Sequence, residues 1–203
     1  MGSRIETQSS IHSSRCNDAR CLVDTLHRKG IPRGVVLDAF RYIPRDCFVP
    51  EDQRRYAWED RPLPIGDGQT ISQPYTVAIM LQLSGASPGE RVLEVGTGSG
   101  YAAALAAYVV GDPTLVTTIE TRRALYDQAK KHLEAIGMDR MTVVHGNGRE
   151  GHPSRAPYDV IIVSAQTPEV PTELTNQLAV GGRLVIPLEV ETYAIMTVVH
   201  KMT

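Results

Sequence analysis

Hydrophobic positions in the first part of the chain recur at helical spacing, and this pattern predicts a small helical region. Leu22, Val23 and Leu26 share one face of a helix that Gly30 ends. Helices or broken helical turns are expected over residues 17–29, 32–42 and 44–58. The last segment contains prolines, which interrupt regular helix. We therefore expect an N-terminal helical cap rather than a separate domain.

A turn-rich segment follows, with the sequence RPLPIGDGQTIS at residues 61–72. Gly66-Asp67-Gly68 lies between two short extended pieces, which predicts a hairpin or a folded loop. Proline is favoured in the first turn of a helix, so Pro74 is expected to open a helix that runs to about Leu83.

From Arg91 onward, apolar strand-like segments alternate with helical ones. Strands are expected at residues 91–95, 115–119, 141–145, 158–163, 183–187 and 194–200, and helices at 101–110, 122–136 and 171–178. This alternation predicts an α/β fold with a doubly wound, mostly parallel sheet. We expect residues 15–203 to form a single domain and residues 1–14 to be a disordered N-terminus.

Composition narrows the function classes. The 203 residues are 42% hydrophobic and 22% charged, with a formal net charge of −2, so no strong nucleic-acid footprint is expected. No apolar run approaches the length of a membrane span, and no secretory signal is visible. Cys16, Cys21 and Cys47 are odd in number and match no zinc spacing. Three free thiols and a cytoplasmic location are therefore expected.

The chemical signal with the clearest spacing is VLEVGTGSGY at residues 92–101, a strand that runs into a glycine-rich turn and a helix. Gly96, Gly98 and Gly100 are spaced GxGxG rather than GxGxxG, the dinucleotide pattern. Glu94 would repel a pyrophosphate but suits a cationic, amino-bearing ligand such as S-adenosylmethionine. A purely structural turn is the alternative interpretation.

Polar residues also follow the next two strands. Glu120 comes about 20 residues after the glycine loop, where an acidic residue is placed to bind ribose hydroxyls. A solvated helix cap is the alternative for Glu120. Asn147-Gly148 follows the third strand and is positioned to meet an adenine. The carboxyl ends of parallel strands are where open α/β sheets bind ligands, so the three segments support one another.

With these residues in view, the chain resembles the protein-L-isoaspartate O-methyltransferases. The most specific segment is RPLPIGDGQTISQPY at residues 61–75, and further matches are FVP at 48–50, PYDVIIVSA at 157–165 and GGRLVIP at 181–187. The resemblance implies a Rossmann-like class I methyltransferase fold with the N-terminal helical cap. It also implies S-adenosylmethionine as the cofactor and an L-isoaspartyl residue of a damaged peptide or protein as the substrate.

The resemblance assigns roles residue by residue. Cofactor binding falls to Gln69, Thr70, Ile71, Glu94, Gly96, Thr97, Gly98, Glu120, Asn147 and Gly148. Substrate contacts fall to Ser72, Tyr75, Ser164 and Ala165, with Ser72 as the catalytic residue. Glu94 and the glycines would hold the methionine end of the cofactor, Glu120 its ribose and Asn147 its adenine.

The residues alone leave other roles open for the substrate set. Ser72 is well placed to be the N-cap of the helix that begins at Pro74. Tyr75 could be a core aromatic, and Ser164-Ala165 an ordinary strand end.

The expected chemistry demands little of the protein. A carboxylate with a pKa of about 4 is already ionised at neutral pH, so methyl transfer to it needs no strong base and no metal. Alignment of the two reactants can supply about 7–11 kcal/mol of the barrier. The expected partner is a peptide bearing isoaspartate or aspartate, with no nucleic acid or membrane, and the chain is expected to be a monomer.

Three departures from the family pattern are present, and the last keeps an alternative open. Asn147 stands where the family usually has aspartate and Tyr75 where it often has histidine, and the segment after Pro187 lacks the usual glycine-rich stretch. A dedicated tailoring enzyme that esterifies an aspartate of a ribosomal precursor peptide, giving aspartimide or isoaspartate, is therefore the alternative to protein repair. A cofactor-binding regulator without turnover is a third interpretation, against which Ser72, Glu94 and Glu120 argue.

Overall fold

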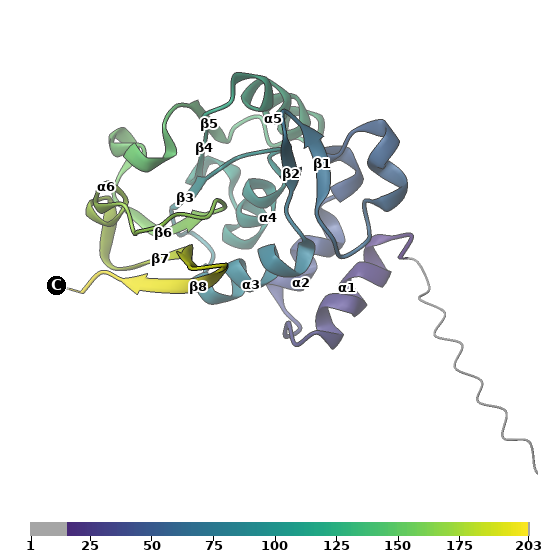
Figure 1. Cartoon of the computed structure of the whole chain (residues 1–203), viewed down its shortest axis with the longest axis horizontal. Helices are drawn as coiled ribbons and strands as arrows, with labels where there is room; N and C mark the ends of the chain where they lie inside the picture. The colour runs from purple at the N-terminus through teal and green to yellow at the C-terminus, as the bar shows by residue number, and fades with distance from the viewer. Residues whose placement is uncertain (1–15, 203) are drawn as a thin grey trace, which may run out of the picture.

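The computed structural model describes residues 16–202, and the expected disordered N-terminus over residues 1–14 lies outside them. Its centre is a six-stranded sheet in the order β5-β4-β3-β6-β7-β8 (Figure 1). The strands are β3 (Val92–Val95), β4 (Val116–Glu120), β5 (Thr142–His145), β6 (Tyr158–Val163), β7 (Leu178–Val190) and β8 (Tyr193–His200). All neighbours are parallel except β7 and β8. The Rossmann-like prediction is confirmed.

The strand order reverses between β3 and β6. The chain runs from β3 to β4 and β5 on one side, then returns to add β6 on the other side of β3. Such a reversal leaves a crevice at the carboxyl ends of the two central strands, because their outgoing loops turn in opposite directions. The sheet thereby fixes where a ligand can enter.

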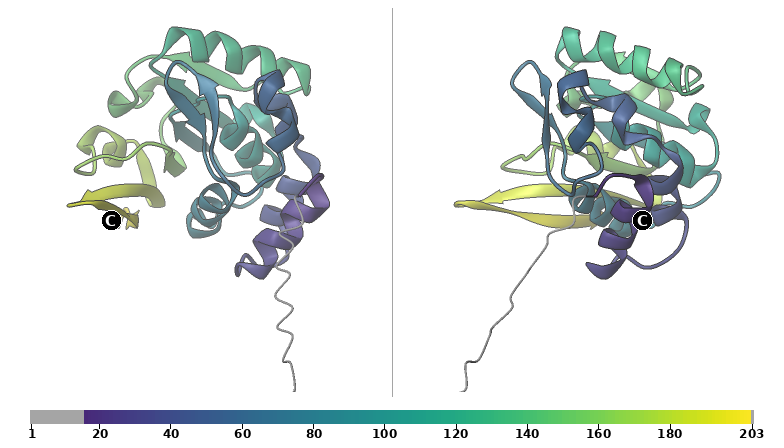
Figure 2. Two further views of the ribbon diagram at one scale, coloured as in Figure 1. Left: turned by 45° about the vertical axis from the view of Figure 1, so that its right-hand side comes forward. Right: turned by 90° about the vertical axis from the view of Figure 1, so that its right-hand side faces the viewer.

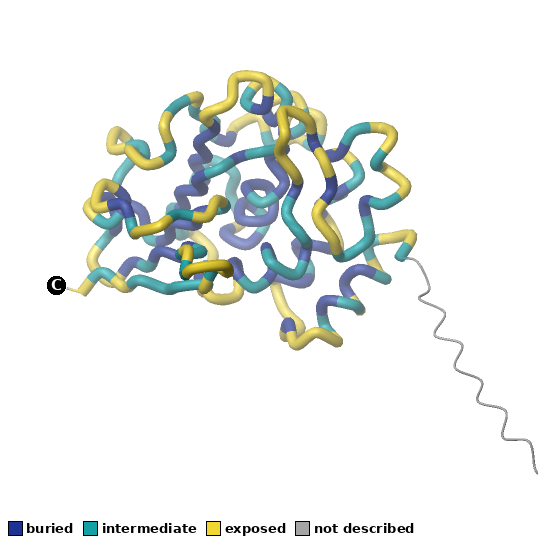
Figure 3. The backbone as a smooth tube through the Cα atoms, in the orientation of Figure 1, coloured by how far each residue is buried: buried dark blue, intermediate teal, exposed yellow. Residues whose placement is uncertain are grey.

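The helices cover the two faces of the sheet unequally. They are α1 (Ala19–Arg28), α2 (Val35–Tyr42), α3 (Pro74–Ser84), α4 (Tyr101–Val110), α5 (Arg123–Ala135) and α6 (Thr172–Asn176). The first five contribute to the larger core together with Val92 and Val160, whereas Leu93 and Ile161 point to a smaller core that includes Leu174 of α6. Figure 3 shows the central strands β3 and β6 and helix α4 as mostly buried.

The N-terminal cap is continuous with the larger core. Leu22, Val23 and Leu26 of α1 are buried in it, as their spacing predicted. Two 3-10 helices, η1 (Arg45–Phe48) and η2 (Glu51–Tyr56), follow α2 and lead into a hairpin of β1 (Leu63–Gly66) and β2 (Gln69–Ile71). The hairpin interpretation of residues 61–72 is thus confirmed. Within residues 16–202, no helix is long and apolar enough to cross a membrane.

The prediction of three free thiols is wrong. Cys16 and Cys21 form a disulfide, with their Cα atoms 5.2 Å apart. Asp18 lies between them as the N-cap of α1, and its side chain accepts a hydrogen bond from the Cys21 amide at 2.9 Å. The cap bends the chain just before the helix and brings the two cysteines within bonding reach, which their spacing did not reveal. Cys47 is free and exposed.

The segment after Pro187 is a strand. β7 continues to Val190 and pairs with β8 in unbroken register from Arg183 opposite His200 to Val190 opposite Tyr193. This hairpin projects from the body of the molecule (Figure 2). The helix expected at residues 171–178 is shorter, because Leu178 already belongs to β7 and pairs with Tyr158.

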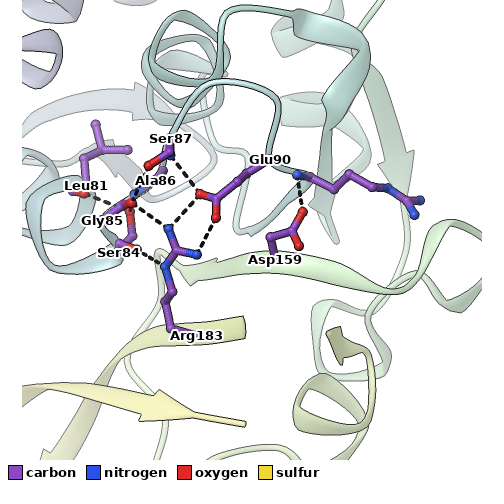
Figure 4. Close-up of polar contacts among 9 residues, drawn as sticks. Leu81, Ser84, Gly85, Ala86, Ser87, Glu90, Asp159 and Arg183 are labelled. Carbon is purple, nitrogen blue, oxygen red and sulfur yellow. Dashed lines mark hydrogen bonds and ion pairs between the residues drawn. The ribbon is translucent and has the colours of Figure 1, made fainter. Parts of the chain in front are cut away.

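A polar clamp joins the loop before β3 to Arg183 of β7 (Figure 4). The Arg183 guanidinium binds both carboxylate oxygens of Glu90 at 2.7 Å. It also donates to the main-chain oxygens of Ser84 and Gly85 at the end of α3. The hydrogen bond from Arg183 lowers the pKa of Glu90. The clamp ties α3 and the loop before β3 to β7.

Candidate active site

A cavity of about 310 Å³ opens at the carboxyl ends of β3 and β6. Its walls come from the glycine loop, the β1–β2 hairpin, the start of α5 and the end of β6. The lining includes the predicted site residues Gln69, Thr70, Ile71, Ser72, Gly96, Thr97, Gly98, Glu120, Ser164 and Ala165. Four segments that are far apart in the sequence thus meet around one space, at the reversal of strand order.

The glycine loop brings main chain close to the opposite wall. Gly96 has φ +99°, in the left-handed region that favours glycine. A Cβ added to Gly96 would lie 3.4 Å from the Ser164 Cβ, so the loop packs directly against the end of β6. The larger side chains are therefore kept out of the junction between β3 and β6.

Glu120 is buried and organises the floor of the cavity. One carboxylate oxygen accepts a hydrogen bond from the Gly98 amide at 2.8 Å, and the other accepts from the Arg122 amide at 2.9 Å. Each carboxylate oxygen can accept more than one hydrogen bond, so capacity for ribose hydroxyls is left. Glu120 is therefore not a solvated helix cap.

A second, mostly apolar cavity of about 200 Å³ adjoins the first. It shares Gly96, Glu120 and Ala165 with the larger cavity and adds Asn147 and Gly148. The two cavities meet at Glu120. Together they suit a nucleoside with a charged tail, because the apolar cavity can take the base and the polar cavity the tail. The predicted order of methionine, ribose and adenine fits these two spaces.

Asn147 is engaged in its own turn. Its side-chain oxygen accepts from the Arg149 amide at 3.1 Å, and its side-chain nitrogen donates to Glu150 at 2.9 Å. A Cβ added to Gly148 would overlap Cγ1 of Val95, so Gly148 shapes the wall of the apolar cavity.

Ser72 does not cap α3. Gln73 holds the N-cap position, and the Asp60 side chain accepts from the Tyr75 amide in the first helical turn at 2.8 Å. Asp60 therefore supplies the acceptor that a capping Ser72 would have provided. Within residues 16–202, the main-chain oxygen of Ser72 accepts a hydrogen bond, but its hydroxyl has no hydrogen-bond partner. The hydroxyl is free to bind a ligand in the cavity.

Glu94 lies beneath the cavity and does not line it. Its side chain is fully buried, and its carboxylate accepts hydrogen bonds from the hydroxyls of Ser164, at 2.6 Å, and Thr118. Burial raises the pKa of Glu94 to about 7. The structure therefore places Glu94 behind Ser164, out of the direct contact that the resemblance implies.

Tyr75 points away from both cavities. Its hydroxyl donates to the Lys29 main-chain oxygen at 3.3 Å, and the Lys29 ammonium lies 5.2 Å from the centre of its ring. The structure does not bring Tyr75 together with the other predicted substrate residues.

Arg122 is a site residue that sequence reasoning missed. It lines the larger cavity and donates to the Asp67 carboxylate, at 3.0 Å, and to the Asp67 main-chain oxygen. It thereby holds the tip of the β1–β2 hairpin over the cavity. Its place two residues after Glu120 was the signal that could have identified it.

The arrangement suits group transfer between two bound molecules. No group of three His, Cys, Asp or Glu side chains within residues 16–202 is placed to hold a metal ion. The cavity offers free and buried hydroxyls, main-chain amides and one carboxylate, which can align reactants and balance charge.

Comparison with known proteins identifies a family. The family model for protein-L-isoaspartate(D-aspartate) O-methyltransferase matches residues 17–203. A protein-L-isoaspartate O-methyltransferase of Roseiflexus sp. (strain RS-1) is 49% identical over 172 residues, which cover 85% of this chain and 78% of the relative. One of Ignicoccus hospitalis is 49% identical over 173 residues, covering 85% of this chain and 82% of that protein.

Solved structures agree. A protein-L-isoaspartate O-methyltransferase superposes with a TM-score of 0.77 and 31% identity over 91% of this chain, which spans 64% of that solved chain, just under two thirds. A Plasmodium falciparum chain assigned as a protein-L-isoaspartate O-methyltransferase, in complex with S-adenosyl-L-homocysteine, superposes with a TM-score of 0.81 and 25% identity, covering 92% of this chain and 91% of that one.

Proposed function

The chain belongs to the protein-L-isoaspartate(D-aspartate) O-methyltransferase family, and we propose that its two joined cavities carry out that family's repair reaction. The enzyme uses S-adenosylmethionine to methylate the α-carboxylate of an L-isoaspartyl residue in a damaged peptide or protein. The methyl ester collapses to a succinimide, which reopens in part to normal aspartate.

The proposal assigns the cofactor to the two cavities in sequence. The apolar cavity at Asn147 and Gly148 takes the adenine, Glu120 takes the ribose, and the glycine loop at Gly96 and Gly98 borders the methionine end. When bound, the cofactor supplies an electrophilic methyl group. The remaining work of this chain is to hold the acceptor carboxylate in line with it and to exclude water.

Ser72 is the residue proposed to hold the acceptor. Its hydroxyl is unbonded within the described chain and faces the larger cavity, where it can donate to one carboxylate oxygen of the substrate. A single hydrogen-bond donor orients the substrate carboxylate but leaves its negative charge in place, and the carboxylate needs that charge to attack the methyl group. The free hydroxyl of Ser72 in this cavity is the observation that carries the proposal.

Relatives nearly 50% identical that are named as protein-L-isoaspartate O-methyltransferases support repair over the tailoring alternative. The atypical residues after Pro187 motivated that alternative, and they lie in the paired β7–β8 hairpin. We also propose that residues 15–203 act as one domain, that the chain is a cytoplasmic monomer, and that it binds no nucleic acid. Light scattering on a sizing column tests the oligomeric state.

The deciding experiment is methyl transfer from labelled S-adenosylmethionine to matched peptides that contain L-isoaspartate or L-aspartate. Turnover of the isoaspartyl peptide alone is expected. Ser72→Ala should lower its kcat/KM by about tenfold or more, as expected for a lost charge-assisted hydrogen bond, while cofactor affinity stays near wild type. Cofactor binding without turnover of either peptide would exclude broad repair.

A further inference from the structure

Four side chains form a buried hydrogen-bonded chain behind the larger cavity. Thr97 and Thr118 join their hydroxyls at 2.6 Å, Thr118 donates to Glu94, and the Ser164 hydroxyl donates to the other Glu94 oxygen at 2.6 Å. Glu94, Thr97 and Thr118 are at most 3% exposed. Ser164 and Thr97, at the two ends of the chain, both line the cavity, but Ser164 is partly exposed whereas Thr97 is only 3% exposed.

The direction of each hydrogen bond follows from the chemistry of the groups. An ionised carboxylate only accepts, so Ser164 and Thr118 must both donate to Glu94. Each hydroxyl has a single proton, so Thr97 must donate to Thr118. The Ser164 proton is likewise committed to Glu94. Its oxygen can therefore offer the cavity only lone pairs.

Ser72 and Ser164, two of the serines that line the cavity, thus differ in what they can offer. Ser72 is unbonded within the described chain and can donate, whereas Ser164 accepts only while Glu94 is ionised. A donor suits an anion, and an acceptor backed by a buried carboxylate suits a cation. The methyl donor carries a positive sulfonium, and the product that remains after transfer is a neutral thioether.

We propose that Ser164, oriented by Glu94, recognises the positive charge of the sulfonium and so lets the enzyme distinguish the methyl donor from the spent thioether product. This inference rests on the proposed function and names a specificity-determining residue within it. The glycine at position 96 makes the arrangement possible, because no side chain stands between the glycine loop and Ser164.

The sulfur of the cofactor loses its positive charge on methyl transfer, so its contact with Ser164 is stronger before the reaction than after it. The acceptor oxygen of Ser164 attracts the polarised C–H groups of a sulfonium and gains little from a neutral sulfur. The contact therefore favours the donor over the product, so that fresh donor replaces the spent product after each turnover. Glu94 acts through Ser164 and is a positioning residue.

The test compares the affinities of S-adenosylmethionine and S-adenosylhomocysteine by calorimetry in the wild type and in Ser164→Ala at pH 8, where Glu94 is mostly ionised. The ratio of the two dissociation constants isolates the sulfonium, because the rest of the two ligands is identical. We expect Ser164→Ala to lower the preference for the methyl donor by about three- to tenfold, while the affinity for S-adenosylhomocysteine stays nearly unchanged. Equal weakening of both ligands, or of neither, would overturn the inference.

Two further variants sharpen the result. Glu94→Gln removes the negative charge behind Ser164 whichever way its amide is oriented, so a weaker preference for the methyl donor is expected. Ser99→Ala removes a different hydroxyl from the same cavity wall and should leave the ratio unchanged. If Glu94→Gln does not fold, Ser164→Ala decides the question. Failure of the wild type to bind either ligand would instead overturn the proposed function.

Discussion

The buried Arg45 guanidinium donates a hydrogen bond from Nη2 to the main-chain oxygen of Ser72 at 3.0 Å. The same side chain donates to the main-chain oxygens of Ala57, Glu59 and Arg61. Burial lowers the pKa of Arg45 to about 10, so it remains charged at neutral pH. One side chain thus fixes the loop that enters the β1–β2 hairpin and the residue that leaves it.

Replacing Arg45 should therefore damage both stability and alignment. Arg45→Met leaves several buried carbonyls without donors, and a loss of about 3 kcal/mol in the free energy of unfolding is expected. Arg45→Lys keeps the charge but lacks the planar fork, so kcat for the isoaspartyl peptide should fall about tenfold or more while cofactor affinity changes little. Urea unfolding and steady-state kinetics measure the two effects. Unchanged kcat in a folded Arg45→Lys would show that the contact does not position Ser72.

Glu94 should make the protein less stable as the pH rises. Its pKa is raised by burial from 4.5 to about 7, so between these values the folded state binds more protons than the unfolded state. The stability is fully present below about pH 4.5 and is lost as the pH rises through about 7, by up to about 3 kcal/mol. Neighbouring Glu120 adds to the same shift.

Urea unfolding of wild type and Glu94→Gln at pH 5 and pH 8 checks this prediction. The amide does not titrate, so the fall in stability between the two pH values should be smaller in the variant. An identical pH dependence in both proteins would contradict the raised pKa.

Gly148→Ala should block the apolar cavity. The added Cβ would overlap Cγ1 of Val95, which belongs to a central strand and cannot move far. A cost of about 1–3 kcal/mol is expected, seen as an affinity for S-adenosylmethionine weakened about tenfold or more. Gly146→Ala is the matched control, because its Cβ would meet neighbours only at 3.7 Å and 4.0 Å. Equal affinities for the two variants would place the adenine elsewhere.

The clamp between Arg183 and Glu90 should stabilise the fold without affecting catalysis or substrate binding. Arg183→Met removes a two-pronged ion pair and two bonds to main-chain oxygens, and should lower the free energy of unfolding by about 1–3 kcal/mol with unchanged KM values. Arg123→Met breaks an exposed ion pair with Asp127 and should leave the free energy of unfolding nearly unchanged. Because the pKa of Glu90 is lowered, the contribution of the clamp is lost as the pH falls through that pKa. A similar loss in both variants, in urea unfolding at neutral pH, would argue against a special role.

Local signals predicted the elements whose ends are marked in the sequence. The bounds of α4 were predicted correctly, because Gly100 and Gly111 lie at its two ends in the left-handed region. The length of β7 was not, because Gly181 and Gly182 break the apolar pattern while pairing with β8 carries the strand onward. The length of such a strand is set by its pairing with distant segments, which local sequence does not reveal.

Site chemistry was predictable by position but not by contact. The positions of Glu94 and Glu120 near the ends of successive strands placed both at the crevice, and only Glu120 lines the cavity. Which carboxylate faces the ligand depends on strand twist and on the hydroxyls of Thr118 and Ser164, which approach from other strands. The cap that Asp60 provides to α3, 15 residues from the amide it binds, likewise had no local signature.

The β1–β2 hairpin is held very differently at its two ends. At its base, the main-chain oxygen of Ser72 accepts a hydrogen bond from the buried Arg45 guanidinium, which is shielded from salt. At its tip, Asp67 forms an ion pair with Arg122 in which both side chains are more than 40% exposed. Exposed pairs contribute little and weaken further as ionic strength rises. The β1–β2 hairpin is therefore rigid near Ser72, where the methyl acceptor is held, and more mobile at its tip over the cavity entrance. Raised salt concentration should speed ligand exchange without disturbing the alignment of the reacting atoms.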